Sequence, residues 1–242
     1  MGALALGYKL EGGHFDAVFL TAPMILVIGG TLGATIITTS VDTVKQVPRY
    51  LLLAFRGVRP SYGAAIDRIV KLAEKARRDG ILGLESELKQ IADPFFKKSV
   101  QLVIDGTEVT ALREILETEI AYIEERHKRG IVFFQKAGGF APTLGILGTV
   151  LGLVHTLGST DDAATMAAAI AAAFIATLWG VGLANLFFLP VSDKLKLLHE
   201  EEVAFLELTT EGVVAIQSGE NPRNIRVRLN SFIAPHHRDS GV

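Results

Sequence analysis

Two apolar stretches of the sequence carry threonine hydroxyls on rows of small residues. On a helix, residues spaced i, i+4, i+7 and i+11 share one face. Two rows have this spacing: Gly145, Thr149, Gly152 and Thr156, and then Ala173, Thr177, Gly180 and Ala184. Small residues let helix backbones approach closely in lipid, so both faces are predicted to pack against other helices. Each hydroxyl either bonds back to the carbonyl four residues earlier or lines a path for water or a cation.

Two prolines favour such a path. Pro142 and Pro190 each lack an amide hydrogen, which leaves a carbonyl oxygen free inside an apolar helix. An ion carrier also needs a charged or titratable group at depth, and these stretches hold no deep Asp, Glu, Lys or Arg. A partner chain must therefore supply the carboxylate. His155 lies near the outer end of its stretch, where an interfacial position is favoured and a proton relay is the alternative.

The composition places these stretches in a membrane. The chain has 242 residues, of which 49% are hydrophobic, and its mean hydropathy is +0.37. A bilayer-spanning helix needs about 20 apolar residues. Three segments qualify, and they predict an all-α polytopic membrane protein with full transmembrane helices at residues 16–39, 131–157 and 167–191. Residues 1–15 hold an apolar run too short to span, and we expect the remnant of a further transmembrane helix and a short outer loop.

Between the first full span and the final transmembrane hairpin, residues 40–130 are rich in Lys, Arg and Glu and predict a helical cytoplasmic domain. One amphipathic stripe comprises Ile66, Ile69, Val70 and Ala73, and a second comprises Val109, Leu112, Leu116, Ile120 and Ile123. Asp93 and Pro94 are predicted to begin a helix as its N-cap and first residue. Basic residues return in the tail, 192–242, whereas the loop 158–166 carries Asp161 and Asp162. By the positive-inside rule the insert and the tail are cytoplasmic and the loop is periplasmic.

Other chemistry finds little support in the sequence. The net charge of -2 does not favour nucleic acid binding, and the absence of cysteine excludes thiolate metal sites. No HExxH, GxSxG or pair of intramembrane aspartates is present, so an intramembrane enzyme is disfavoured. His127 and the pair His236 and His237 are interpreted as solvated surface. We predict no metal and no cofactor other than a transported ion.

Three longer stretches carry a resemblance to a known family. PTLGILGTVLGLVHTLG, IAAAFIATLWGVGLANLFFLPVSDKLK and EGVVAIQSGENPR resemble MotA, the flagellar motor stator family within the MotA/TolQ/ExbB group. The similarity covers about residues 1–230. The family has four spans, so the resemblance implies that most of the first is missing here. It implies a ring of such subunits in the bacterial inner membrane around a MotB dimer, whose transmembrane helix supplies an aspartate. Proton or sodium flow then drives torque on the rotor protein FliG.

The resemblance also implies roles for single residues. Pro142 and Pro190 match the family's two functional prolines, and Thr149 and Thr177 match its channel-lining hydroxyls, with Gly145, Gly152 and Ala173 on the same MotB-facing rows. Arg77 and Glu85, on either side of a turn at Gly80, match the charges that meet FliG, and Arg78 is an additional charge. Without the resemblance, these charges would be read as an ordinary solvated face. An ExbB- or TolQ-like energiser of transport, with three spans, is the alternative, and the transported ion stays open.

Overall fold

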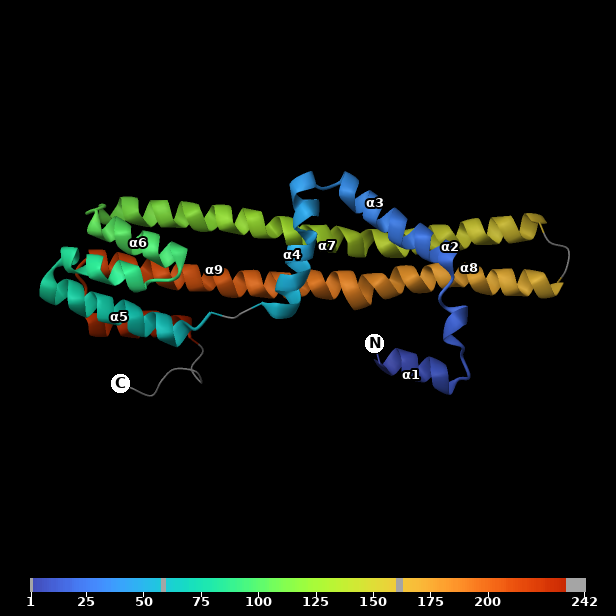
Figure 1. Ribbon diagram of the computed structural model, residues 1–242, viewed down its shortest axis with the longest axis horizontal. Coiled ribbons are helices and arrows are strands. Elements are labelled where there is room, and N and C mark those ends of the chain that lie inside the picture. The colour runs from blue at the N-terminus through green and yellow to red at the C-terminus, as the bar shows by residue number, and fades with distance from the viewer. Residues whose placement is uncertain (1, 58–59, 160–162, 234–242) are drawn as a thin grey trace. The chain divides into compact units, whose positions relative to one another are not determined.

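The computed structural model describes residues 2–57, 60–159 and 163–233, and the regular elements in these ranges are all helical (Figure 1). The all-α prediction is therefore confirmed for this part of the chain. The α-helices are α1 (Gly2–Leu10), α2 (Thr21–Met24), α3 (Gly30–Ile37), α4 (Val41–Arg56), α5 (Tyr62–Asp79), α6 (Pro94–Ile104), α7 (Val109–Ser159), α8 (Ala163–Leu183), α9 (Leu189–Gln217) and α10 (Pro222–Leu229). The remaining elements are the π-helical segments η2 (Ile25–Gly29) and η4 (Ala184–Phe188) and the 3₁₀-helices η1 (Phe15–Ala17), η3 (Ile81–Gln90) and η5 (Asn230–Phe232). The predictions for Asp161, Asp162, His236 and His237 lie outside the described residues.

The chain divides into two compact units. The first, here the hairpin unit, comprises residues 1–56 and 128–196, and the second, here the charged unit, comprises residues 57–127 and 197–242. Among the described residues, two helices are long and apolar enough to cross a membrane, Val109–Gly158 and Ala163–Gln217. They include two of the three predicted spans. The third, predicted at 16–39, is a shorter apolar helix, Thr21–Ile37, because residues 15–17 form a separate 3₁₀ turn. The number of spans therefore stays a prediction.

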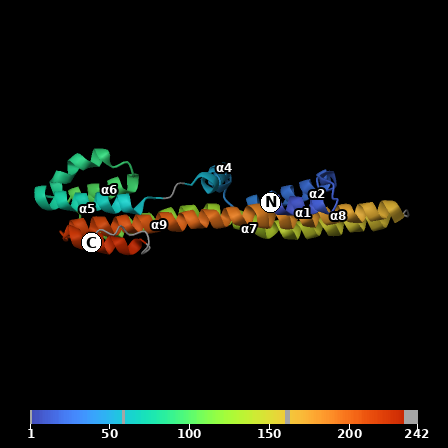
Figure 2. The same cartoon turned by 90° about the horizontal axis from the view of Figure 1, so that it is seen from below.

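In the hairpin unit, α7 and α8 run antiparallel and α2 lies beside α8 (Figures 1 and 2). Aromatic side chains of α7 and η4, among them Phe134 and Phe188, form a buried cluster with Ala54 of α4. Tyr50 of α4 covers Gly130, where a β-carbon would lie 3.0 Å from the tyrosine ring. These contacts hold α4 against α7 although Pro48 lies inside α4. The packing thus stabilises the helix at a residue that lowers helix propensity.

The charged unit has a core of large aliphatic side chains. Both predicted stripes face it, since Ile69, Leu112 and Leu116 are fully buried. The predicted start of α6 is confirmed, because the Asp93 carboxylate accepts a hydrogen bond of 2.7 Å from the amide of Phe96. The last helical turns of α9 also pack into this core, and the helix ends at Gln217.

Candidate functional site

The two predicted rows of small residues meet between α7 and α8. Gly145 and Gly180 lie so close that a β-carbon on Gly145 would be 2.8 Å from the carbonyl oxygen of Ala176. A β-carbon on Gly180 would be 2.5 Å from the carbonyl oxygen of Ala141. Farther along the pair, a β-carbon on Gly152 would lie 2.9 Å from that of Ala173. These positions bring backbone against backbone, so glycine is required at Gly145 and Gly180 by the space available.

Thr149 and Thr177 face each other at the centre of this contact. Their hydroxyl oxygens are 2.6 Å apart, and either can donate the hydrogen bond. The Thr149 hydroxyl also lies 2.9 Å from the carbonyl oxygen of Ala173 on the other helix and 3.2 Å from that of Gly145 on its own. Thr177 is 3.4 Å from the Gly145 carbonyl. The two hydroxyls thus share two carbonyl oxygens across the helix pair, and Thr149 does more than bond back to its own helix.

The other two threonines in the apolar part of α7 behave differently. Thr156 is buried but donates only within its helix, to the Gly152 carbonyl at 2.8 Å. Thr143 is exposed and donates to the Phe140 carbonyl at 2.8 Å. Burial on the row of small residues is therefore not enough to bring a threonine of α7 into the polar cluster. His155 is exposed and stands outside the small-residue row.

The first apolar helix contributes a third face. Gly30 packs on Leu144, whereas Gly29 and Gly33 have no neighbour within 4 Å. Two fully buried threonines, Thr31 and Thr35, lie one turn apart on this helix. Thr35 donates to the Thr31 carbonyl at 2.7 Å, and the Thr31 hydroxyl has no hydrogen-bond partner among the described residues. The spacing of the two threonines was the sequence signal for this buried polar face.

This first apolar helix is held at both ends by α7 and α8. The Lys136 ammonium donates to the carbonyl oxygen of Thr38 at 2.9 Å, where α3 ends. A cation at this position neutralises the partial negative charge at the end of a helix. At the other end, the Trp179 indole donates to the carbonyl oxygen of Val18 at 2.8 Å. Neither contact could be predicted from spacing, because each joins segments more than 90 residues apart in the sequence.

The two predicted hinge prolines occupy different settings. Pro142 lies inside α7, which continues without interruption from Val109 to Ser159. Pro190 follows the π-helical segment η4, and Pro23 comes just before the other π-helical segment, η2. A π turn carries one extra residue and shifts the backbone hydrogen bonds, and such turns recur at functional sites. Sequence reasoning missed both π segments.

In the charged unit, the predicted rotor-facing residues lie at the junction of α5 and η3. Gly80 has a φ of 78°, a left-handed conformation that favours glycine, and it turns the chain between Arg77 and Glu85. Both side chains are exposed. Arg78 instead forms an ion pair of 2.8 Å with Asp79. Its hydrogen bond to that carboxylate lowers the pKa of Asp79, so the pair remains ionised at neutral pH.

His127, interpreted from the sequence as solvated surface, is only partly exposed. Its side chain is 24% exposed, and its Nδ1 lies 3.7 Å from a carboxylate oxygen of Glu202. Its ring contacts that of His199 edge to face, with the centroids 5.6 Å apart. Two residues of α9, Glu202 and His199, thus cover part of this histidine. Among the described residues, no three His, Asp or Glu side chains are grouped to hold a metal ion.

Comparison with known proteins shows which proteins this chain is similar to. Residues 1–80 match the motility protein A N-terminal domain and residues 87–208 match the MotA/TolQ/ExbB proton channel family. The chain is 40% identical over 239 residues to motility protein A of Borreliella burgdorferi. The aligned region covers 98% of this chain and 91% of that protein.

Two solved structures share the fold. The C. jejuni MotAB structure matches with a TM-score of 0.93 at 29% identity, covering 100% of this chain and 94% of that one. The flagellar MotAB stator complex from Bacillus subtilis matches with a TM-score of 0.92 at 32% identity, covering 97% and 92%. The chain therefore belongs to the MotA/TolQ/ExbB proton channel family.

Proposed function

We propose that this protein is a stator subunit of the bacterial flagellar motor, and that with a MotB-type partner it couples ion flow to torque on the rotor. The observation that carries the proposal is the agreement of sequence and fold with motility protein A and the MotAB stator complex over nearly the whole chain. The match of residues 1–80 to the motility protein A N-terminal domain disfavours the ExbB- or TolQ-like alternative. The protein lies in the inner membrane, with residues 40–130 and 192–242 in the cytoplasm.

The hydroxyl pair of Thr149 and Thr177 is proposed to belong to the ion path. Two hydroxyls and the carbonyls of Gly145 and Ala173 offer oxygen atoms of the kind that replace water around a cation. The apolar helices contribute no deep carboxylate. A MotB-type helix would complete the path by placing an aspartate beside this cluster, and a ring of these subunits would surround the MotB pair.

Coupling of the ion to movement is assigned to the prolines and to the charged turn. Pro142 and Pro190 remove backbone hydrogen bonds, so the helices bend there at low cost. Arg77 and Glu85 are exposed and form no ion pair among the described residues, so both are available to charges on FliG. Arg78 is proposed as a weaker contributor, because Asp79 already neutralises it. Exposed charges steer and orient a contact that has to be remade at each step.

Motility assays test the function directly. The complete gene and its MotB-type neighbour, expressed in a strain without stators, should restore swimming. A proton uncoupler stops a proton-driven motor, and removal of sodium stops a sodium-driven one. Absence of swimming at normal protein levels in the membrane would contradict the proposal.

Charge reversal tests the rotor contact. Arg77→Glu and Glu85→Lys should each lower torque while leaving MotB association unchanged, because neither side chain is in a core. Lys97→Glu, an exposed charge on α6, is the matched control and should swim normally. Normal torque in both turn variants would show that the rotor contact lies elsewhere.

A further inference from the structure

The helix α4 carries an apolar stripe that the hairpin unit leaves uncovered. Its inner face, with Val47, Tyr50 and Ala54, packs into the buried cluster formed with α7 and η4. A second apolar set has the spacing i, i+7, i+11 and i+14 and therefore shares another face of the helix. This exposed stripe consists of Val41, Pro48, Leu52 and Phe55, and the exposed fractions of Val41, Leu52 and Phe55 are 68%, 54% and 74%. A contiguous apolar face of this kind marks an interaction surface.

A row of cations borders this exposed stripe. Lys45, Arg49 and Arg56 have the spacing i, i+4 and i+11, so they share one face of α4. Lys45 and Arg56 each come four residues after a member of the stripe, Val41 and Leu52, which makes them its neighbours on the helix surface. All three cations are exposed, and none forms an ion pair with a described residue. The helix thus presents an apolar face and a basic face side by side.

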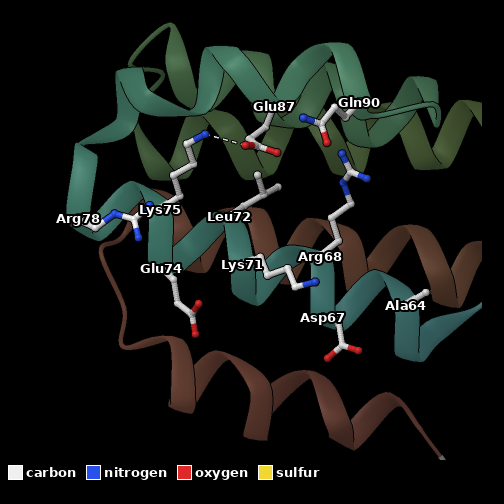
Figure 3. Close-up of a pocket in the computed structure, with 10 residues that line it drawn as sticks. All are labelled: Ala64, Asp67, Arg68, Lys71, Leu72, Glu74, Lys75, Arg78, Glu87 and Gln90. Atoms are coloured by element: carbon white, nitrogen blue, oxygen red, sulfur yellow. Dashed lines mark hydrogen bonds and ion pairs between the residues drawn. The ribbon is translucent and has the colours of Figure 1, made fainter.

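Several cations of the charged unit, in contrast, have carboxylate partners. On α5, Lys75 pairs with Glu87 at 2.6 Å across a polar pocket between α5 and η3 (Figure 3). Arg226 of α10 pairs with Asp67 of α5 at 2.7 Å. In α4 the one acidic residue is Asp42, against three cations. The positive charge of α4 is therefore not balanced within the helix, and an anionic partner would complement it.

The level at which α4 packs is the level at which the apolar part of the hairpin unit begins. The Tyr50 ring covers Gly130 of α7, and Ala54 shares a buried cluster with Phe134 and Val191. The apolar stretches of α7 and α8 lie on one side of these contacts in the sequence. On the other side the chain is charged and mostly basic, with Lys128, Arg129, Asp193, Lys194 and Lys196. In a membrane protein this transition lies where hydrocarbon gives way to lipid headgroups.

The course of α4 fits this level. A short turn, residues 38–40, joins α3 to α4. Two contacts fix the turn: the Lys136 ammonium donates to the Thr38 carbonyl at 2.9 Å, and the Thr43 amide donates to the Ser40 hydroxyl at 3.3 Å. Within the hairpin unit, α4 runs across α7 rather than along it (Figures 1 and 2). A helix that crosses a membrane-spanning helix in this way lies along the membrane surface.

We propose that α4 binds the headgroups of acidic phospholipids at the cytoplasmic surface of the membrane. The exposed stripe enters the boundary between headgroups and acyl chains, and Lys45, Arg49 and Arg56 meet the phosphates. Helices with an apolar face beside a basic face bind membranes in this way, and the cytoplasmic leaflet supplies the anionic lipid. Bound lipid thereby holds the end of α3 and the adjoining part of α7 at one depth. The inference rests on the inner-membrane location proposed above, and not on the ion path or the rotor contact.

Single labels test the depth of α4. The chain contains no cysteine, so with a cysteine-free partner a nitroxide can be attached at Phe55→Cys or Asp42→Cys alone. In the stator complex, reconstituted into phosphatidylglycerol and phosphatidylcholine, oxygen should relax the Phe55 label more than a water-soluble nickel complex does. The Asp42 label, on the polar side of α4, should show the reverse. Equal access of the nickel complex to both labels would overturn the inference. So would a Phe55 label that neither reagent reaches, because a second protein chain would then cover the exposed stripe.

A fluorophore on the same Phe55→Cys tests the choice of headgroup. Brominated phosphatidylglycerol should quench it at lower mole fraction than brominated phosphatidylcholine does, and added salt should reduce this preference. Lys45→Gln and Arg49→Gln should each lower the preference about fivefold, which corresponds to about 1 kcal/mol for each charge near the surface. Lys97→Gln, which removes an exposed cation of α6, is the matched control and should leave it unchanged.

An undiminished preference in the double variant Lys45→Gln/Arg49→Gln would overturn headgroup binding by α4. Both side chains are exposed, so the variants should fold, and chromatography of the complex checks that the ring is intact. A complex that keeps its preference for phosphatidylglycerol but does not turn the motor would support this inference and contradict the proposed function, so the two failures are distinguishable.

Discussion

Within the hairpin unit, α7 and α8 meet backbone to backbone, whereas in the charged unit the helices meet through large aliphatic side chains. Gly180 lies against the Ala141 carbonyl, but Gly212 of α9, the comparable close contact in the charged unit, lies against the side chains of Ile69 and Leu229. Such a difference is expected between helices that pack in lipid and helices that pack in water. Water drives the burial of large apolar side chains. Lipid does not, so helices within it associate through close approach and shared hydrogen bonds.

The largest stability effect is expected in the aliphatic core. Leu112→Ala removes a fully buried side chain from the charged unit and should lower the free energy of unfolding by about 2–5 kcal/mol. Ile115→Ala, on the same helix and 39% exposed, is the control and should cost much less. The thermal unfolding midpoint of the purified, detergent-solubilised protein measures both. Equal shifts would mean that the charged unit is not held by this core.

A smaller loss is expected from overpacking the glycine contact. Gly180→Ala places a methyl group against the Ala141 carbonyl and should cost about 1–3 kcal/mol, with loss of motility. Gly182→Ala, where nothing lies within 4 Å, should be neutral. Disulfide crosslinking between cysteines placed on α7 and α8 would report any separation of the helices. Unchanged crosslinking and swimming in Gly180→Ala would contradict backbone-to-backbone packing.

The hydroxyl pair should matter more for function than for stability. Thr149→Val and Thr177→Val keep the shape of the side chain and remove the hydroxyl, at a cost of about 0.6 kcal/mol for an average intramembrane hydrogen bond. Protein levels and MotB association should stay near normal, while motility or its ion dependence changes. The exposed Thr143→Val is the control. Equal damage from Thr143→Val would rule out a special role for the pair, and loss of membrane insertion in Thr149→Val would favour packing alone.

The smallest effect is expected from the exposed ion pair. Because the pKa of Asp79 is lowered in the folded protein, its pair with Arg78 stabilises the fold above the ordinary carboxyl pKa. That contribution disappears as the pH falls through the lowered pKa. The unfolding midpoints of wild type and Asp79→Asn should therefore differ slightly at neutral pH and converge in acid. Glu85→Gln is the control, because Glu85 forms no ion pair among the described residues, and its unfolding midpoint should not converge with that of wild type in this way. If the difference between wild type and Asp79→Asn stays constant with pH, the ion pair is not the source of that difference.

The sequence predicted the local features of both units well. The α5 stripe, the α7 stripe and the Asp93 cap depend on neighbouring residues along the chain, and all three are confirmed. The facing rows at Gly145 and Gly180 were also predictable, because a short loop forces the two helices to lie side by side. The spacing alone did not show that Thr149 and Thr177 touch each other rather than only their own helices.

The remaining features depend on contacts between distant segments. The π-helical segments at 25–29 and 184–188 have no residue type that specifies them. The environment of His127 depends on α9, which follows it by more than 60 residues. The Lys136 contact with Thr38 likewise pairs a side chain with a backbone atom, for which sequence carries no signal. Roles of the candidate site residues stay predictions until the variants are measured.

The hydrogen bond between the Thr149 and Thr177 hydroxyls can run in either direction, which gives the hydroxyl protons two possible arrangements. While the two hydroxyls bond each other, only one hydroxyl proton remains for the two carbonyl oxygens, so one carbonyl accepts no hydroxyl hydrogen bond. In one order, Thr177 donates to Thr149, Thr149 donates to Ala173, and the Gly145 carbonyl accepts no hydroxyl proton. In the other, Thr149 donates to Thr177, Thr177 donates to Gly145, and the Ala173 carbonyl accepts no hydroxyl proton. Rotation of two O–H bonds exchanges these orders without moving a heavy atom, which reverses the local dipole and transfers the vacant acceptor from one helix to the other.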